Sequence, residues 1–253
     1  MAQKCTVGGA AYEIKGGRTL VGGVGYAITK GRTLVDGVGY DVSFAPAAAL
    51  PTFDGSCNFY GNANKGWVEL LEDGTLTFPN TANLASCDVY LLENGEAGHN
   101  SLSLQNARSG GKGGDHAEWY RLDLRGTEAT VKIDEVTKFT LDDGRNYDTG
   151  DADNGSAGGT SAAPTGANGH APFGGTLKAI DALGSKKLGA GGGYNGGNAG
   201  GTYGGGEGAG GIGSSGKPGL ANTGGGGGGA NGNRAGGAGG TGIAIVRWGY
   251  ETA

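Results

Sequence analysis

The clearest pattern of hydrophobic and polar positions lies between residues 51 and 141, where the two kinds of residue alternate over short segments. These segments are rich in β-branched and aromatic residues, and none has the 3.6-residue period of a helix. The pattern predicts strands at Trp67–Leu71, Thr75–Phe78, Cys87–Leu92, Tyr120–Leu124, Ala129–Ile133 and Lys138–Leu141. An Asp-Gly pair between the first two strands predicts that they form a β-hairpin.

A seventh strand is predicted at Ile243–Trp248, directly after a tract, 189–242, in which about half the residues are glycine. A flexible linker leads into solvent or to another domain, whereas this tract leads to one short apolar segment that needs a sheet to join. We therefore interpret the glycines as loops inside a domain, and we expect Ile243–Trp248 to pair beside Cys87–Leu92. The fold predicted is an antiparallel β-sandwich with long glycine-rich loops at its end.

The first 44 residues carry a different pattern, a repeat with a period of fourteen residues. Val7–Leu20 returns as Val21–Leu34 and in part as Val35–Phe44. Each unit contains a Tyr-x-Ile/Val strand and an Arg-Thr-Leu-Val strand, separated by turns that contain glycine. Such a narrow ribbon buries too little apolar surface to be stable alone. Copies from other subunits are the cover we favour, and the following domain of the same chain is the alternative.

The chain is therefore expected to be all-β, with fourteen-residue β repeats over residues 1–45 and a glycine-rich β domain over residues 46–253. We place the strands of that domain at about 67–141 and 243–248, and its glycine-rich loops at 150–242. The repeats are predicted to be an attachment and oligomerisation segment that forms a homotrimer. The residues predicted to face the shared axis are Tyr12, Ile14, Tyr26, Ile28, Tyr40 and Val42.

Ordering the glycine tract requires a collective gain in free energy. Fixing the backbone of one residue costs about 1–2 kcal/mol, and glycine loses more freedom than any other residue. Packed polyglycine II helices supply such a gain, because their N–H and C=O groups point outward and neighbours without a Cβ approach closely enough to hydrogen-bond. We expect such helices at Gly191–Gly193, Gly204–Gly206 and Gly224–Gly229. The alternative is a disordered low-complexity tract.

Composition and charge exclude several classes of function. The formal net charge is -5, and the acidic and basic residues are interspersed, so no basic stripe for nucleic acid is present. No run of eighteen apolar residues predicts membrane insertion. The cysteines Cys5, Cys57 and Cys87 have no CxxC spacing, which favours buried free thiols over a disulfide framework or a zinc site.

Several motif matches carry no chemistry. Gly211–Lys217 fits the P-loop pattern, but a proline takes the place of the Ser or Thr that binds magnesium. Residues 148–155 resemble the start of a calcium loop without the glutamate at its twelfth position. His99, His116 and His170 lie far apart in polar segments, where surface positions are expected, and no Ser or Cys stands in a nucleophile elbow. We expect no enzyme activity, no metal and no cofactor.

Several motifs follow one another in a fixed order along the chain. They are Gly-Thr-Leu-Thr-Phe at Gly74–Phe78, Cys-Asp-Val-Tyr-Leu-Leu at Cys87–Leu92 and Gly-Gly-Lys-Gly-Gly at Gly110–Gly114. The Ala129–Ile133 strand, long glycine tracts and a closing Gly-Ile-Ala-Ile-Val-Arg-Trp come after them. This order resembles the glycine-rich domain of bacteriophage tail proteins, over about 67–248. Such domains often read Val-Gly-Gly-Gly after the Asp-Val-x-Leu strand. This chain has Glu93–Asn100 there instead, so its first loop is expected to pack differently.

The resemblance implies a virion structural protein, assembled in the host cytoplasm. Some tail-fibre tip adhesins use related glycine tracts as packed polyglycine II helices, and the Gly-Arg-Thr-Leu-Val-x-Gly-Val-Gly-Tyr repeat is similar to segments in virion proteins of phages that infect Gram-positive bacteria. A tail-fibre or fibre-tip adhesin that binds host-surface glycans is the function we favour, with other virion proteins bound to the repeats. A head fibre, a capsid decoration protein or a tail-assembly protein is the alternative.

On the adhesin hypothesis, the residues that interrupt the glycine runs contact the glycan. Tyrosine and asparagine on fixed loops suit glycans because they stack on sugar rings and hydrogen-bond to hydroxyl groups. The residues predicted to bind are Tyr194, Asn195, Asn198, Tyr203, Asn231 and Asn233.

Overall fold

The computed structural model divides the chain into two units, Met1–Ala48 and Ala49–Ala253. The residues that it describes are 3–7, 10–14, 18–21, 24–27, 30–35, 38–43, 48–103, 108–170, 172–175, 188–194, 197–201 and 204–250. Within these residues the regular elements are β-strands and two short 3-10 helices, η1 (Ala82–Leu84) and η2 (Pro172–Gly175), and no α-helix is present. The protein is all-β, as the sequence predicts.

The first unit consists of antiparallel strand pairs that span the start of each repeat unit. The pairs are β1 (Gln3–Val7) with β2 (Ala10–Ile14), β3 (Arg18–Val21) with β4 (Val24–Ala27), and β5 (Lys30–Val35) with β6 (Val38–Ser43). Two residues separate the strands of each pair, and they are Gly-Gly, Gly-Gly and Asp-Gly in turn. These are the residues that two-residue hairpin turns favour. The second and third hairpins therefore join one repeat unit to the next, and the first hairpin lies at the start of the first repeat unit.

The predicted oligomerisation residues divide between the strands of this unit and the undescribed residues. Tyr12 and Ile14 belong to β2, and Tyr26 belongs to β4. Tyr40 and Val42 belong to β6, whereas Ile28 lies outside the described residues. The homotrimer stays a prediction.

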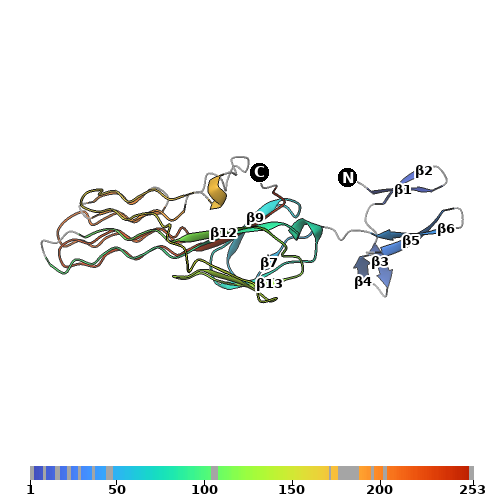
Figure 1. The fold of residues 1–253 in the computed structure, drawn as a ribbon, viewed down its shortest axis with the longest axis horizontal. Helices are drawn as coiled ribbons and strands as arrows, with labels where there is room; N and C mark the ends of the chain where they lie inside the picture. Colours follow the sequence, from blue (N-terminus) through green and yellow to red (C-terminus); the bar gives the residue numbers. More distant parts are fainter. Residues whose placement is uncertain are drawn as a thin grey trace. The chain divides into compact units, whose positions relative to one another are not determined.

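The second unit contains two five-stranded antiparallel sheets, consistent with a β-sandwich. The first sheet has the order β15 (Asn146–Asp148), β14 (Lys138–Leu141), β13 (Glu128–Lys132), β10 (Gly74–Thr77) and β7 (Thr52–Phe53). The second sheet has the order β12 (His116–Leu122), β11 (Cys87–Leu92), β16 (Ile243–Trp248), β9 (Gly66–Leu70) and β8 (Cys57–Gly61). Figure 1 shows several of these strands close together in this unit.

The two sheets share one hydrophobic core. Val131 and Phe139 of the first sheet are buried in the same cluster as Val89, Val246 and Trp248 of the second. Strands β13 and β14 alternate between buried and exposed residues, so one face of the first sheet meets solvent. Strands β11 and β16 are buried along their whole length, because a second cluster covers the other face of their sheet.

The terminal strand confirms the pairing predicted from the sequence. β16 pairs with β11 from Cys87↔Trp248 to Leu92↔Ile243, and it pairs with β9 on its other side. The last strand of the described chain is therefore the middle strand of the second sheet. The glycine tract leads into this sheet at Ile243, and Leu188 at its start is buried in the cluster that covers the sheet.

The predicted hairpin between residues 67 and 78 is wrong. β9 lies in the second sheet and β10 in the first, so the turn at Asp73 carries the chain from one sheet to the other. Leu70 and Leu76 are both buried in the shared core, each on a different sheet. At Gly74 a Cβ would lie 2.6 Å from the Phe53 ring, so the crossing requires glycine.

The boundaries of the other strands differ in two ways from the prediction. β12 begins at His116 rather than Tyr120, and the short edge strands β7, β8 and β15 were not predicted.

The prediction of buried free thiols holds for Cys87, while the free Cys57 is only partly buried. Cys5 belongs to β1, where side chains are not described.

The glycine-rich segments run side by side beyond the strand ends of the second unit (Figure 1). We call them the glycine bundle, and it consists of residues 93–101, 108–115, 153–159, 164–170, 188–194, 197–201, 204–210, 213–220, 223–231 and 234–242. Glu93 follows β11, Asp115 precedes β12 and Gly242 precedes β16, so these residues mark the root of the bundle at the second sheet.

Candidate functional site

The segment 223–231 lies at the centre of the glycine bundle. The N–H groups of residues 226–228 donate to three different segments, and those of residues 229–231 donate to the same three in the same order. The C=O groups of residues 224–226 accept from three further segments, and those of residues 227–229 repeat this order. The six neighbours are 93–101, 108–115, 188–194, 204–210, 213–220 and 234–242. The central segment is thus hydrogen-bonded on all sides with a period of three residues.

The close approach of these backbones requires glycine. A Cβ at Gly227 would lie 1.9 Å from the carbonyl oxygen of Gly237, and one at Gly192 would lie 2.0 Å from that of Gly227. Real Cβ atoms do not come within 3.0 Å of such atoms. At Gly210, in a turn, a Cβ would meet nothing within 4 Å. Side chains are therefore excluded from the interior of the bundle and allowed at its turns.

The first loop, where this chain departs from the glycine-rich pattern, belongs to the bundle. The expectation that it packs differently from the corresponding loop of phage tail domains stays a prediction. Residues 93–101 take part in the same packing as the glycine runs, because the N–H groups of Gly95 and Gly98 donate to Gly240 and Gly237 at 2.9 and 2.8 Å. Glycine occupies the positions of this segment that meet other backbones: a Cβ at Gly98 would lie 2.0 Å from the carbonyl oxygen of Gly228. Glycine at positions 95 and 98 is therefore enough for this segment to pack in the bundle.

The end of the bundle away from the sheets is its tip. Consecutive segments end and begin there at residues 101 and 108, 159 and 164, 194 and 197, 210 and 213, and 231 and 234, and we call these connections the tip turns. Three of these turns contact one another: the Ser101 N–H donates to the Arg234 carbonyl at 2.9 Å, and the Gly213 N–H donates to that of Asn231 at 3.2 Å. The Arg234 Nε donates to the Gly213 carbonyl at 2.9 Å. These turns form one continuous surface.

Two exposed apolar side chains at the tip were not predicted from the sequence. Leu102 and Ile212 are 78% and 76% exposed, more than the other large hydrophobic residues of the described chain. Leu102 is flanked by serines and Ile212 by glycines. Ile212 stands alone among glycines, which was the available signal that it does not face a core. Leu102 alternates with Leu104 between serines and gave no such signal.

The structure brings only part of the predicted ligand set to the tip. Tyr194, Asn231 and Asn233 lie in tip turns, and Asn233 is exposed with a φ of 58°. Asn198 follows the turn 194–197, and its carbonyl accepts the Gly208 N–H at 2.9 Å.

The remaining two predicted ligand residues, Asn195 and Tyr203, lie outside the described residues. Gly204, the next described residue after Tyr203, lies at the root, where its carbonyl accepts the Leu220 N–H at 2.8 Å.

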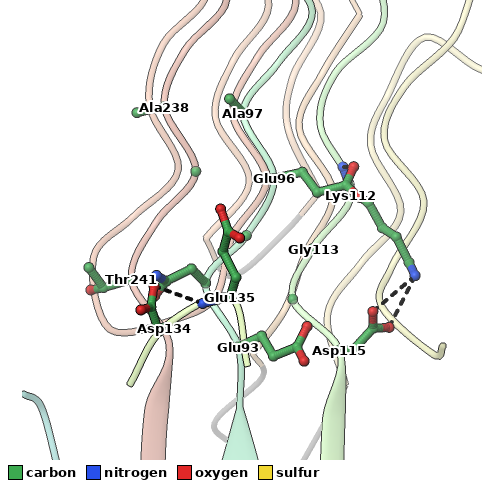
Figure 2. A pocket seen from close by; sticks show the side chains of 14 residues that line it. Glu93, Glu96, Ala97, Lys112, Gly113, Asp115, Asp134, Glu135, Ala238 and Thr241 are labelled. Atoms are coloured by element: carbon green, nitrogen blue, oxygen red, sulfur yellow. Dashed lines mark hydrogen bonds and ion pairs between the residues drawn. The ribbon is translucent and has the colours of Figure 1, made fainter. Parts of the chain in front are cut away.

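A concave surface lies at the root of the bundle (Figure 2). The hollow has a volume of about 640 Å³, and several carboxylates line it. The Oδ1 of Asp115 accepts the N–H groups of Asn154 and Gly155 at 2.6 and 2.5 Å and lies 3.1 Å from the Lys112 Nζ. The Thr149 hydroxyl donates to Glu93 at 2.5 Å. These carboxylates join the bundle to the sheets.

The pKa of one carboxyl group in the hollow reflects its contacts with the sheets. Burial raises the pKa of the Glu93 carboxyl, and the hydrogen bond from Thr149 acts in the opposite direction. Within the described residues, no group of three or more His, Cys, Asp and Glu side chains is arranged to hold a metal ion. We place the candidate binding surface at the tip, because exposed apolar and polar side chains share one continuous surface there.

The histidines do not all lie apart on the surface, as the sequence predicted. The rings of His116 and His170 stack with their centroids 3.6 Å apart. The Tyr90 hydroxyl lies 2.6 Å from the Nε2 of His170. Burial lowers the pKa of both histidines, and His116 helps to lower that of His170 to about 4. Segment 164–170 ends beside β11, which brings together residues that are distant in the sequence.

Comparisons of the chain with family models, curated proteins and solved structures give no match. In the parts of the chain that the structure describes, no helix has the length and apolar character needed to cross a membrane. The glycine bundle and its tip are therefore the features that bear on function.

Proposed function

We propose that this protein is a bacteriophage virion component whose glycine bundle is a polyglycine II array carrying a receptor-binding tip. The three-residue hydrogen-bond period around segment 223–231 supports this. Polyglycine II has three residues per turn and no hydrogen bonds within one helix. Its N–H and C=O groups therefore pair with neighbours on every side. We also propose that the two sheets close as a β-sandwich that anchors this array.

A rigid bundle with tolerant turns suits an adhesin. Binding residues are commonly placed on loops that a rigid scaffold positions. Here the interior accepts only glycine and a few alanines, whereas a turn position such as Gly210 has free space around it. The tip can therefore change in sequence without loss of the scaffold.

Host-surface glycans are the ligand class we propose. Tyr194 offers an aromatic ring, and Asn231 and Asn233 offer amide donors and acceptors on the tip turns. Rings that stack on sugars and amides that bind hydroxyl groups are the groups such recognition uses. The N-terminal repeats would attach the protein to other virion proteins, as a homotrimer.

Attachment of the free protein to bacteria tests this function. We would label the full-length protein and measure its binding to a panel of bacterial strains by flow cytometry. The tip variant is Tyr194→Ala with Asn233→Gly, and the matched control at the root is Asn222→Gly. Asn222 and Asn233 both have a φ of 58°, so glycine preserves the backbone at each position.

We expect the tip variant to bind the recognised strain about tenfold more weakly, which corresponds to about 1.4 kcal/mol. The root variant should bind as the unchanged protein does. Equal binding by both variants would contradict a receptor-binding tip. Failure of the unchanged protein to bind any strain would favour a head fibre, a capsid decoration protein or a tail-assembly protein.

A further inference from the structure

The tip of the glycine bundle differs in charge from its root. The five tip turns contain two arginines, Arg108 and Arg234, and no aspartate or glutamate. The carboxylates lie at the other end, where Glu93, Asp115 and Asp134 line the hollow. A protein with a net charge of -5 thus presents a turn surface that carries only positive charge.

The lysines of the bundle are neutralised and the tip arginines are not. Lys112 pairs with Asp115 and Asp153, and Lys217 pairs with Glu207. In the described part of the chain no carboxylate pairs with Arg108 or Arg234.

The two arginines are held differently by their surroundings. Arg234 lies along the turn 210–213, because its Nε donates to the Gly213 carbonyl. The Nε of Arg108 is buried and has no hydrogen-bond partner. A buried donor without a partner is destabilising, and an anionic ligand that accepts from it would remove that cost.

Both arginines border the same segment. The Arg234 carbonyl accepts the Ser101 N–H, and the Ser109 carbonyl, next to Arg108, accepts the His99 N–H at 3.0 Å. Segments 108–115 and 234–242 therefore flank the end of segment 93–101 on its two sides. His99, Asn100 and Leu102 are exposed on that segment. We call residues 99–102 with Arg108 and Arg234 the tip patch.

Distance keeps the root carboxylates from cancelling the charge of the tip patch. Seven residues separate Arg108 from Asp115, which is roughly 20 Å at about 3 Å per residue. The Debye length at physiological ionic strength is about 8 Å. Glu96 is closer, four residues or roughly 12 Å before Asn100, which is still beyond the Debye length, and Glu207 is paired with Lys217. The two arginines therefore dominate the field at the tip patch.

We propose that the tip patch binds the anionic groups of a surface polysaccharide, phosphate or carboxylate, through Arg108 and Arg234. This inference rests on the proposed function and names its ligand class. A guanidinium group presents a planar fork of donors that matches the oxygens of phosphate and carboxylate. Asn100 and Leu102 are exposed on the segment that both arginines border, and they would contact the sugar backbone.

Retention on immobilised polymers tests the inference. The full-length protein would be applied to poly(glycerol phosphate), to polygalacturonate and to neutral dextran, which separates phosphate from carboxylate as the source of charge. We expect retention on one or both anionic polymers and none on dextran. Retention should fall at roughly 0.5 M salt, where screening is nearly complete over the length of an ion pair.

Matched variants connect the retention to the two arginines. Arg108→Gln with Arg234→Gln should lose about tenfold or more in affinity, because two charge-assisted contacts are removed. Lys132→Gln with Lys217→Gln changes the net charge by the same amount but leaves the tip patch intact, and it should be retained. Arg108→Lys with Arg234→Lys keeps the charge and should recover part of the affinity. Thermal unfolding of each variant confirms that it is folded.

Equal retention of the Arg→Gln variant, or no retention of the unchanged protein on either anionic polymer, would overturn the inference. Bacteria that bind the unchanged protein and the Arg→Gln variant equally would also overturn it, while leaving the adhesin function in place. Arginine-dependent retention without attachment to any strain would support the tip patch and contradict the adhesin.

Discussion

The sheets and the glycine bundle of the second unit hold their chains together in different ways. The sheets bury large side chains, including Trp248, Tyr90 and Phe139, and gain free energy from apolar surface removed from water. The bundle interior buries backbone: residues 189–193 and 224–230 are all buried and all glycine or alanine. Removing side chains is thus a second way to build a close-packed interior.

The difference has an energetic consequence. A hydrogen bond contributes about 0.5–1.5 kcal/mol net, and ordering a residue costs about 1–2 kcal/mol. Hydrogen bonds alone therefore leave a glycine segment close to balance. Complete enclosure and attachment to the sheet through 93–101, 108–115 and 234–242 are what make the bundle stable. A substitution that destabilises the sheet is therefore expected to destabilise the bundle as well, whereas a substitution in a turn should change only the structure of that turn.

The largest expected effect follows from a charge placed in the sheet core. Val246→Asp puts a carboxylate at a fully buried position of the middle strand, where no partner is available. We expect a loss of stability of about 4 kcal/mol or more, because the charge must be buried or the strand displaced. Thermal unfolding measures this, with Thr130→Asp on the exposed face of β13 as the control. Equal unfolding temperatures would show that β16 is peripheral.

The second effect tests the bundle by itself. Gly227→Ala places a methyl group 1.9 Å from a backbone oxygen, whereas Gly210→Ala adds the same group in open space. We expect Gly227→Ala to lower the free energy of unfolding by about 3 kcal/mol, through overpacking and lost hydrogen bonds. Gly210→Ala should stay within about 0.5 kcal/mol.

Amide hydrogen exchange gives an independent measurement of the same contrast. The N–H groups of residues 226–229 donate to neighbouring backbones, so they should exchange slowly in the unchanged protein and faster in Gly227→Ala. A silent Gly227→Ala together with fast exchange over residues 226–229 would contradict a packed bundle.

The smallest effect is a dependence of stability on pH at the junction of bundle and sheet. The pKa of His170 is about 4 in the folded protein and about 6.5 when unfolded, so between these values the unfolded chain binds more protons. Stability is therefore retained above pH 6.5 and lost as the pH falls toward 4. We expect a loss of about 2 kcal/mol, since partial exposure of the ring reduces the full effect.

Denaturant unfolding at several pH values measures this loss. His170→Gln should flatten the pH dependence, because the stacked pair with His116 no longer exists. An unchanged pH dependence in His170→Gln would assign the effect to other groups.

The sequence predicted the sheets better than it predicted the tip. The strands Cys87–Leu92 and Ile243–Trp248 and their pairing could be predicted, because both are rich in apolar residues and the short segment after the glycine tract needs a sheet to join. The hairpin at Asp73 failed because an Asp-Gly pair indicates a tight turn but not which sheet receives each strand. The edge strands are short and partly exposed, so their pattern is weak.

The candidate site could be predicted only in part. The glycine runs indicated packed helices, but the neighbours of each run depend on contacts between segments that are distant in the chain. Local patterns therefore could not show that Asn231 and Asn233 share a surface with Leu102 and Arg234, or that Gly204 lies at the opposite end. The stacking of His116 on His170 could not be predicted either, because these residues are also distant in the chain.

The position of β16 determines when this protein can fold. The middle strand of the second sheet is the last one in the described chain, and Gly95 and Ser101 depend on Gly240 and Arg234 for their hydrogen bonds. Contacts so distant in sequence form slowly, because a long loop must close before any of them stabilises the chain. A ribosome must therefore have released nearly all of this unit before its sheet can close, and the glycine segments remain soluble during that wait because they expose so little apolar surface.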